Sequence, residues 1–346
     1  MKLLRYLLAP FALLYWLGVW LRNAAYDLGL RRSQAVAIKS ICVGNLTVGG
    51  TGKTPHTEYL LRLLQGEFQV GMLSRGYRRR TKGYVEASTD STALQVGDEP
   101  LQIKRKFPNA TVAVEADRLA GVAAMQRAHP QLQVVLLDDA FQHRRLKPGL
   151  SLLLIDYSRP IYADHMLPMG WLRDTFAQRR RADVVVVTKC PASLTEQQMA
   201  DAKQRLRLLS HQQLYFTRMA YGALRPILSP QQPMAMPPQV AVLCGIARPQ
   251  PFIDYLQQHT QLVAEFVFPD HHNFAKREII AIFEQISRHG DHIPLITTEK
   301  DAARLIGLNL PEHIAQRIAY QEVAVEFVGN QSESFNKTIL RYVREN

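Results

Sequence analysis

Residues 43–54 decide the fold of this chain and read Val43-Gly44-Asn45-Leu46-Thr47-Val48-Gly49-Gly50-Thr51-Gly52-Lys53-Thr54. A β-like run, Ser40 to Val43, leads into this stretch, and a helix-like run, Pro55 to Leu64, follows it. A strand, a glycine-rich loop ending in Gly-Lys-Thr and a helix make up the phosphate-binding loop of nucleoside triphosphatases, because backbone N–H groups and the helix dipole then face the phosphates. The stretch therefore predicts a nucleoside triphosphate site formed by residues 47–54.

Two side chains in this loop have predicted roles. Lys53 is expected to reach the β- and γ-phosphates, and the Thr54 hydroxyl is expected to hold Mg²⁺. The loop departs from the usual pattern at one position, since Thr47 stands where the first glycine is expected. The alternative is a chance Gly-Lys-Thr in a surface turn.

The overall composition limits what the chain binds. Its 346 residues, 47% of them hydrophobic, suggest two domains with packed cores. A net charge of +12 implies an anionic partner, which is a nucleic acid, a membrane surface or a phosphorylated substrate. The three cysteines, Cys42, Cys190 and Cys244, are far apart and form no Cys-x-x-Cys pair, which indicates a reducing compartment.

Residues 1–32 differ in composition from the rest of the chain. The run Tyr6 to Leu21 is uncharged and mostly apolar, has basic residues on both sides, and is interrupted by Pro10. At 16 residues it is shorter than the roughly 20 that a spanning helix needs. Its tryptophans and tyrosines suit a bilayer interface, so we predict an amphipathic helix lying on the cytoplasmic face of a membrane. A buried core helix is the alternative.

Beyond this segment, strand-like and helix-like runs alternate, which predicts an α/β fold with a parallel sheet flanked by helices. The predicted strands are Lys39–Val43, Gln69–Leu73, Thr111–Val114, Val134–Leu137, Leu150–Ile155 and Val184–Thr188, and in a second, smaller α/β domain Ala241–Cys244, Leu262–Phe268 and Pro294–Thr297. Five prolines lie between the two patterns. We therefore predict a P-loop domain over 33–224, a linker over 225–239 and a C-terminal domain over 240–346.

Carboxylates supply the second chemical signal. The apolar strand Val134–Leu137 ends in Asp138 and Asp139, the place where P-loop proteins carry a Mg²⁺-binding carboxylate. Asp138 is the predicted metal partner, with Asp139 at a second metal or at a water. Asp98 and Glu99 start another helix-like run, where they either cap the helix or, for Asp98, accept the proton of an acceptor hydroxyl.

Histidines and arginines supply weaker signals. The run Asp270-His271-His272-Asn273 matches no standard zinc spacing and is either functional or a simple turn. Basic residues cluster at 75–80, 144–147 and 179–181, where they are either solvated or recognise phosphates. Few aromatic residues lie among them, which argues against single-stranded nucleic acid as a partner.

A set of motifs spread along the chain points to one known family. They are the apolar N-terminus, residues 43–55, Leu73-Ser74-Arg75-Gly76-Tyr77, Val96-Gly97-Asp98-Glu99-Pro100, Leu137-Asp138-Asp139-Ala140-Phe141-Gln142-His143, Leu167-Pro168-Met169-Gly170-Trp171-Leu172-Arg173-Asp174, Phe268-Pro269-Asp270-His271-His272 and Thr297-Thr298-Glu299-Lys300-Asp301. In these motifs the chain resembles the tetraacyldisaccharide 4′-kinases of lipid A assembly, almost from end to end. Thr47 is ordinary in this family. At Asp174 the family commonly has glutamate.

The resemblance implies an ATP- and Mg²⁺-dependent kinase at the cytoplasmic face of the inner membrane. It implies phosphorylation of the 4′-hydroxyl of an acylated glucosamine disaccharide 1-phosphate, which gives lipid IVA. The implied site residues are Asp98 as general base with His271 as its partner, Lys53 and Thr54 at the phosphates and Mg²⁺, Asp138 as metal carboxylate, Asp139, Glu99 and Asp270 as supporting acids, and Arg75, Tyr77, Arg118 and Arg173 at the lipid head group.

Three other classes of protein fit less well. Partitioning ATPases have a lysine before the glycine pair, where this chain has Val48. Regulatory GTPases have the motif Asn-Lys-x-Asp after a late strand, where this chain has Thr188-Lys189-Cys190-Pro191. A nucleic-acid-dependent ATPase would explain the positive charge but not the apolar N-terminus, so no nucleic-acid partner is expected.

Overall fold

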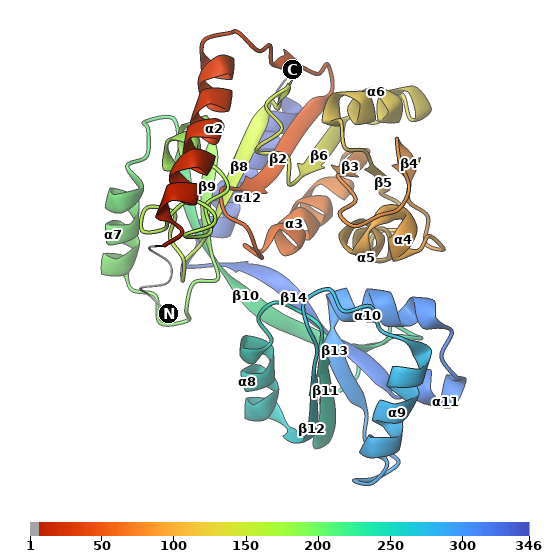
Figure 1. The fold of residues 1–346 in the computed structure, drawn as a ribbon. Helices are drawn as coiled ribbons and strands as arrows, with labels where there is room; N and C mark the ends of the chain where they lie inside the picture. The colour runs from red at the N-terminus through yellow and green to blue at the C-terminus, as the bar shows by residue number, and fades with distance from the viewer. Residues whose placement is uncertain (1–6, 346) are drawn as a thin grey trace.

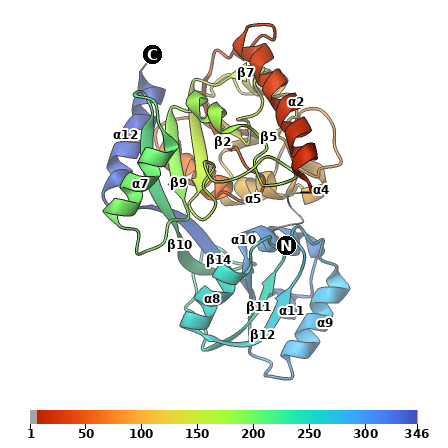
Figure 2. The same cartoon turned by 60° about the vertical axis from the view of Figure 1, so that its left-hand side comes forward.

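The computed structural model describes residues 7–345, and these form two lobes joined by a pair of long strands (Figures 1 and 2). The large lobe comprises residues 7–212 and 328–345, and the small lobe comprises residues 227–317. The connecting strands are β10 (Gln213–Pro226) and β14 (Ile318–Phe327), which pair antiparallel. A single sheet runs through both lobes in the order β12-β11-β13-β14-β10-β9-β8-β2-β6-β3-β5-β4.

The large lobe is a parallel sheet covered by helices. Its strands are β2 (Lys39–Asn45), β3 (Val70–Ser74), β5 (Thr111–Val114), β6 (Val134–Asp138), β8 (Leu150–Asp156) and β9 (Val184–Thr188), with β4 (Val85–Glu86) antiparallel at the edge and β1 (Gln34–Ala35) paired separately with β7 (Leu146–Lys147). Its helices are α2 (Ala9–Asp27), α3 (Lys53–Gln65), α4 (Ala93–Val96), α5 (Asp98–Lys106), α6 (Arg118–Ala128), α7 (Glu196–Leu206), α12 (Gln331–Arg344) and the 3₁₀ turn η1 (Phe176–Arg181).

The small lobe repeats this design on a smaller scale. Its strands are β11 (Gln239–Cys244), β12 (Gln261–Val267) and β13 (Leu295–Thr298), all parallel, and its helices are α8 (Gln250–His259), α9 (Lys276–Ile286), α10 (Glu299–Leu305), α11 (Glu312–Ala315) and the 3₁₀ turn η2 (Ile306–Leu308). The α/β class with a mainly parallel sheet, predicted from the alternation of patterns, is confirmed.

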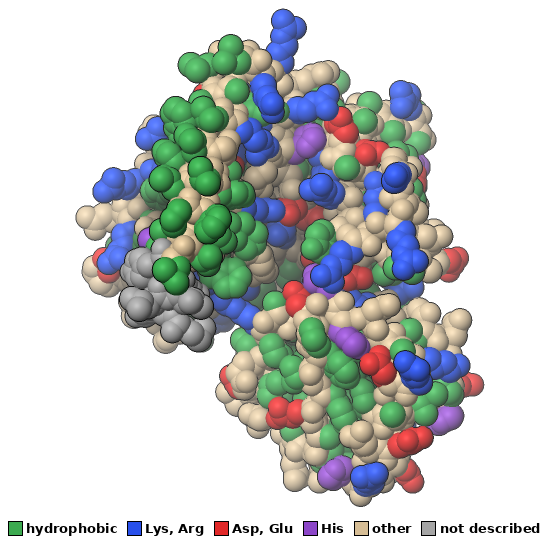
Figure 3. Space-filling model, in the orientation of Figure 1, with side chains coloured by type: hydrophobic (Ala, Val, Ile, Leu, Met, Phe, Trp, Pro, Cys, Tyr) green, Lys and Arg blue, Asp and Glu red, His purple; other side chains and the backbone are tan. Residues whose placement is uncertain are grey.

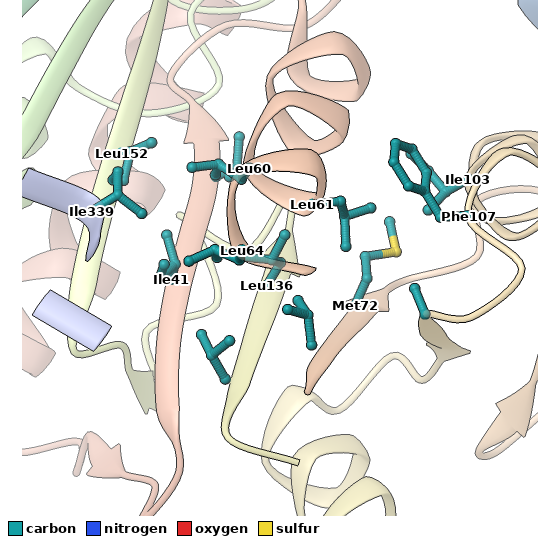
Figure 4. Close-up of a cluster of buried hydrophobic side chains, with 14 of the residues drawn as sticks. Ile41, Leu60, Leu61, Leu64, Met72, Ile103, Phe107, Leu136, Leu152 and Ile339 are labelled. Atoms are coloured by element: carbon teal, nitrogen blue, oxygen red, sulfur yellow. The ribbon is translucent and has the colours of Figure 1, made fainter. Parts of the chain in front are cut away.

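Apolar side chains on both faces of the large-lobe sheet explain why its strands read as continuous hydrophobic runs. On one face, Ile41 and Leu136 pack against Leu60 and Leu64 of α3 (Figure 4). The same cluster contains Ile339 of α12, which is fully buried. Full burial of one such side chain stabilises the fold by about 1.5–3 kcal/mol.

The structure differs from the expected division at 240–346, because α12 lies in the large lobe. The Tyr59 hydroxyl donates to Asn336 Oδ1 over 2.9 Å, and Phe335 is buried against Tyr59. The range 225–239 likewise begins inside β10, so the chain crosses between the lobes on β10 and β14. Two paired strands, and not one flexible linker, therefore connect the lobes.

Residues 1–6 of the expected N-terminal helix lie outside the described residues, and the rest of that prediction falls on α2. Ala12 and Asn23 are its buried residues, so α2 is not a core helix. Among residues 7–345, no helix has both the length and the apolar character needed to cross a membrane.

A buried ionic cluster joins the two lobes. Lys106 of α5 lies 2.6 Å from Glu58 of α3 and also forms an ion pair with Glu299 of α10. Burial and the charge of Glu299 raise the pKa of Glu58 to about 7, because together they outweigh the attraction of Lys106, which lowers it. This cluster therefore ties the helix that follows the phosphate loop to the small lobe through a carboxylate that titrates near neutrality.

The Glu58 carboxyl is expected to weaken the fold as pH rises. Its pKa in the fold, about 7, exceeds the ordinary value of 4.5, so its stabilising contribution is complete below pH 4.5 and is lost as pH rises through about 7. We expect Glu58→Gln to abolish this loss. Between pH 5 and pH 8, the free energy of unfolding of the wild type should therefore fall by about 1–3 kcal/mol more than that of the variant. Urea unfolding at both pH values measures the difference. The exposed Glu284→Gln is the control, and a pH-independent difference for Glu58→Gln would contradict the expectation.

Candidate active site

The predicted phosphate loop connects β2 to α3 at the carboxyl edge of the sheet. Gly49 and Gly52 have backbone φ angles of 94° and 86°, which residues with a Cβ atom rarely adopt. Gly52 caps α3, so the free N–H groups of the first helical turn face the loop. β2 lies between β6 and β8, and the loop therefore opens at the centre of the large-lobe sheet, the usual ligand position in such folds.

Neighbouring segments hold this loop in place. Asn45 Nδ2 donates to Thr51 Oγ1 over 2.9 Å, and Thr188 Oγ1 donates to the Thr51 carbonyl over 2.8 Å. The Val48 N–H donates to the Trp171 carbonyl over 2.8 Å, and Thr47 forms a β-bridge with Leu172. Side-chain and backbone contacts within the protein thus hold the loop in place, and such preorganisation lowers the entropy cost of binding.

Asp138 lies at the end of β6, beside this loop. It is 3% exposed and accepts a hydrogen bond of 3.0 Å from Ser74 Oγ. Burial, together with the nearby charges of Glu99 and Asp139, raises the pKa of Asp138 to about 7. A buried carboxylate with this surplus of negative charge around it favours a cation.

Asp139 faces Lys53 across the loop. Lys53 Nζ lies 3.8 Å from Asp139 Oδ1, and Arg173 donates two hydrogen bonds to the same carboxylate, one of them 3.0 Å long. Burial alone would raise the pKa of Asp139, but Lys53 and Arg173 lower it to about 2. Asp139 thus pairs with the lysine that was predicted to reach the phosphates.

The oxygen donors beside the loop fit Mg²⁺ bound together with a triphosphate. Within residues 7–345, no three His, Cys, Asp or Glu side chains gather into a group that could hold a metal ion alone. Mg²⁺ typically takes only one or two carboxylates and completes its shell with phosphates and water. Asp138, Glu99 and the half-buried Thr54 supply oxygen ligands of the required type next to the loop.

Asp98 begins α5 and meets the small lobe directly. His271 Nδ1 lies 3.2 Å from Asp98 Oδ2, and Arg304 donates to the same oxygen from Nε over 2.9 Å and from Nη2 over 2.7 Å. Burial opposes ionisation, but the hydrogen bonds from His271 and Arg304 outweigh it and lower the pKa of Asp98 to about 2. The structure therefore brings together the two residues that were predicted to pair as base and partner.

The two adjacent histidines have different environments. His271 has a left-handed φ of 61°, lies 5.8 Å from Tyr77 between ring centroids, and contacts Lys300 Nζ through Nε2 at 3.1 Å. His272 instead stacks on Phe268 and contacts Glu278 at 3.3 Å within its own lobe. Only His271 faces Asp98. The exposed Asp270 lies 3.9 Å from His271 Nε2.

The four residues predicted at the lipid head group fall into two pairs. Arg75 and Tyr77 are exposed and line a hollow of about 450 Å³ together with further basic side chains. Arg118 is 2% exposed and donates to the carbonyls of Glu115 and Asp138, while Arg173 holds Asp139. Arg118 thus fixes the end of β6 from a buried position.

Residues 4–344 match the protein family described as tetraacyldisaccharide-1-P 4′-kinase. The chain belongs to this family. It is 42% identical over 354 residues to the tetraacyldisaccharide 4′-kinase of Bacteroides thetaiotaomicron, covering 98% of this chain and 93% of the relative. It is 39% identical over 350 residues to that of Flavobacterium johnsoniae, covering 100% and 99%.

The same family includes a solved structure. The crystal structure of LpxK from Aquifex aeolicus in complex with ATP superposes with a TM-score of 0.78 at 26% identity, covering 98% of this chain and 99% of the other. The resemblance predicted from the sequence motifs is therefore confirmed, and so is the α/β architecture of the family.

Three side chains of this kinase site were missed in the sequence. Ser74 and Asn45 lie inside quoted motifs, but their hydrogen bonds to Asp138 and Thr51 carry no sequence signal of their own. Arg304 lies three residues after Asp301, and its helical spacing from the Thr297–Asp301 motif could have placed it on the same face of a helix. Its contact with Asp98 joins positions 206 residues apart, which no local pattern reveals.

Proposed function

We propose that this chain transfers the γ-phosphoryl group of ATP to the 4′-hydroxyl of tetraacyldisaccharide 1-phosphate, which forms lipid IVA in lipid A biosynthesis. The observation that carries the proposal is the position of Asp98 in a chain of this family. Asp98 lies beside His271 of the small lobe, at the carboxyl edge of the sheet that also carries the phosphate loop. A base and a triphosphate site on one sheet edge are what transfer to an alcohol requires.

The chain's own groups would act as follows. The loop of residues 47–52 binds the phosphates through backbone N–H groups, and Lys53 leaves Asp139 to neutralise charge between the β- and γ-phosphates. Mg²⁺, held by Thr54 and Asp138 with Glu99 and Asp139 nearby, would supply further charge neutralisation. Asp98 accepts the proton of the acceptor hydroxyl, and His271 orients its carboxylate.

We propose a division of labour that follows the lobes. The range 33–224 binds nucleotide and supplies Asp98, and the range 240–346 supplies His271, except that α12 belongs with the kinase lobe. Residues 225–239 comprise the end of β10 and the start of the small lobe, and the proposed hinge is the β10–β14 pair. Closure about this hinge would exclude water from the transferring phosphoryl group.

We further propose that residues 1–32 place the enzyme on the cytoplasmic face of the inner membrane. Large apolar side chains cover α2 and the segment after it, and Figure 3 shows them gathered along the helix. The exposed ones are Leu7, Leu8, Phe11, Leu13, Leu14, Tyr15, Trp16, Leu17, Trp20, Leu21, Leu28 and Leu30. A patch of this extent on a basic protein suits an anionic lipid surface, where the acylated acceptor is also found.

The helix is also fixed to the site. The Tyr15 hydroxyl donates to the Arg173 carbonyl over 3.2 Å, and Asn23 Nδ2 donates to Asp174 Oδ1 over 2.8 Å. Arg173 in turn holds Asp139. A membrane surface bound to α2 would therefore lie at a fixed position relative to the carboxylates, which suits an acceptor whose acyl chains stay in the bilayer.

Removing the apolar surface of α2 is expected to release the protein from membranes. Burial of a leucine side chain contributes about 1.5–3 kcal/mol, so Leu13→Gln, Leu14→Gln and Leu17→Gln together should weaken partitioning by at least about 100-fold. Sedimentation with anionic vesicles measures it. The control changes two exposed leucines elsewhere, Leu209→Gln and Leu228→Gln. Equal sedimentation of the α2 variant and wild type would contradict a membrane role for this helix.

The proposed reaction is tested with γ-labelled ATP and acylated disaccharide 1-phosphate in detergent micelles. The expected product is a doubly phosphorylated lipid that carries the label at the 4′ position. A matched acceptor whose 4′-hydroxyl is blocked should remain unlabelled. Absence of labelled lipid with the unblocked acceptor, or equal labelling of both acceptors, would rule out the proposed function.

A further inference from the structure

The carboxylate of Asp98 is held at only one of its two oxygens. The hydrogen bonds from His271 and Arg304 all end on Oδ2. Among residues 7–345, no side chain or backbone group donates a hydrogen bond to Oδ1. The small lobe thus fixes one oxygen of the base and leaves the other available to a ligand.

Arg304 is itself held within the small lobe. Its Nη1 donates to Asp301 Oδ1 over 2.8 Å and to the Gly245 carbonyl at 3.3 Å. Asp301 is fully buried, and its Oδ2 accepts hydrogen bonds from the Gly245 N–H over 2.9 Å and from Thr298 Oγ1 over 2.8 Å. The Arg304 side chain is 6% exposed. Asp301 and the Gly245 carbonyl, both in the small lobe, therefore orient its guanidinium independently of the large lobe.

We propose that Arg304 is a positioning residue for the acceptor step: anchored by Asp301, it fixes Oδ2 of Asp98 and thereby directs Oδ1 toward the acceptor hydroxyl. This inference rests on the proposed function. In the step, the acceptor O–H bond breaks and its proton goes to Oδ1. The acceptor oxygen bonds to the γ-phosphorus, and the bond from that phosphorus to the β–γ bridging oxygen breaks, with its electron pair leaving on ADP.

A guanidinium beside a base is compatible with this chemistry. Phosphoryl transfer to an alcohol has a largely dissociative transition state in most analyses, so a well-aligned carboxylate can serve as the base without being a strong one. The planar fork of arginine can donate to two carboxylates at once in a fixed geometry, which a lysine ammonium does not reproduce. Arg304 meets this requirement, since its Nη1 donates to Asp301 while its Nε and Nη2 donate to Asp98.

The position of Arg304 also couples the base to the arrangement of the lobes. α10, which carries Arg304, packs against α5, which begins at Asp98. Any opening of the hinge separates these helices and removes the contact. The fixed orientation of Asp98 is therefore available only when the lobes are close together.

The test compares Arg304→Ala with Arg105→Ala, a matched loss of an arginine between the lobes. Arg105 donates to the Ala303 carbonyl over 2.8 Å and does not contact Asp98. We expect Arg304→Ala to lower kcat by about 10- to 100-fold, with KM for ATP unchanged within about twofold. Millimolar guanidinium ion should restore at least about a tenth of the lost rate in Arg304→Ala and have no effect on Arg105→Ala. Arg304→Lys should retain part of the activity.

Wild type in the same assay separates this inference from the proposed function, because absence of transfer by wild type defeats the function itself. If wild type is active, an unchanged kcat in Arg304→Ala overturns the inference. An equal loss in Arg105→Ala, or a loss that guanidinium does not restore, also overturns it, because the arginine then acts only by holding the lobes together. Thermal unfolding checks that both alanine variants are folded. If Arg304→Ala does not fold, Arg304→Lys replaces it in the test. A kcat of Arg304→Lys equal to that of wild type then overturns the inference, and a reduced kcat supports it.

Discussion

Replacing Asp98 by asparagine is expected to lower kcat for lipid phosphorylation by about 10³-fold, within the range that general bases contribute. Asparagine preserves the shape of the side chain but has no basic oxygen, so the acceptor hydroxyl keeps its proton. Because Asp98 lies on α5 and not on the phosphate loop, KM for ATP should change little. Steady-state kinetics with the acylated disaccharide 1-phosphate measure both constants.

Two controls accompany the Asp98 variant. Asp201→Asn removes an exposed carboxylate on α7 and should leave kcat as in wild type. Thermal unfolding is needed because Asp98→Asn also weakens the contact with Arg304 and His271. Turnover by a folded Asp98→Asn within about threefold of wild type would remove Asp98 from the role of base.

The strand, loop and helix over residues 39–65 could be predicted because their signals are local. The strand, the glycines and the helix lie within one continuous stretch, and the φ values of Gly49 and Gly52 account for the presence of glycine there. Asp138 was predicted for the same reason, since an apolar strand that ends in a carboxylate needs only neighbouring residues to be recognised. The structure places it 3.0 Å from Ser74 and beside the loop.

The contact between the lobes could not be predicted in the same way. The residues of motif 268–272 were quoted, but the pairing of His271 with Asp98 came from the family resemblance. Arg304 was missed because its partner is 206 positions away in the sequence and belongs to the other lobe. Contacts of this kind depend on how the two lobes lie relative to each other, and no periodic pattern in the sequence encodes that.

The connecting strands β10 and β14 were missed for a different reason. Each begins in one lobe and ends in the other, so their burial changes along their length and neither continuous nor alternating hydrophobicity persists. β10 also shifts register between Tyr221 and Leu224. Its end at Pro226 overlaps the proline-rich range that was predicted as a linker, since proline is tolerated at the end of a strand.

Replacing Lys53 by alanine is expected to abolish phosphoryl transfer, with a loss of about 10³-fold or more. Lys53 is the first residue of α3, and its ammonium lies 3.8 Å from Asp139 at the edge of the phosphate loop. Without it, Asp139 and the γ-phosphate would repel each other across the loop. We therefore expect both weaker ATP binding and a lower kcat, measured by calorimetric titration with Mg-ATP and by single-turnover transfer.

The control for Lys53→Ala is Lys203→Ala on the exposed face of α7, which should behave as wild type in both measurements. Lys53→Arg keeps the charge but not the compact geometry, so it should bind Mg-ATP more tightly than Lys53→Ala and still transfer slowly. Wild-type transfer by a folded Lys53→Ala would mean that the triphosphate binds elsewhere. The assignment of residues 47–54 as the triphosphate site therefore depends on this one side chain.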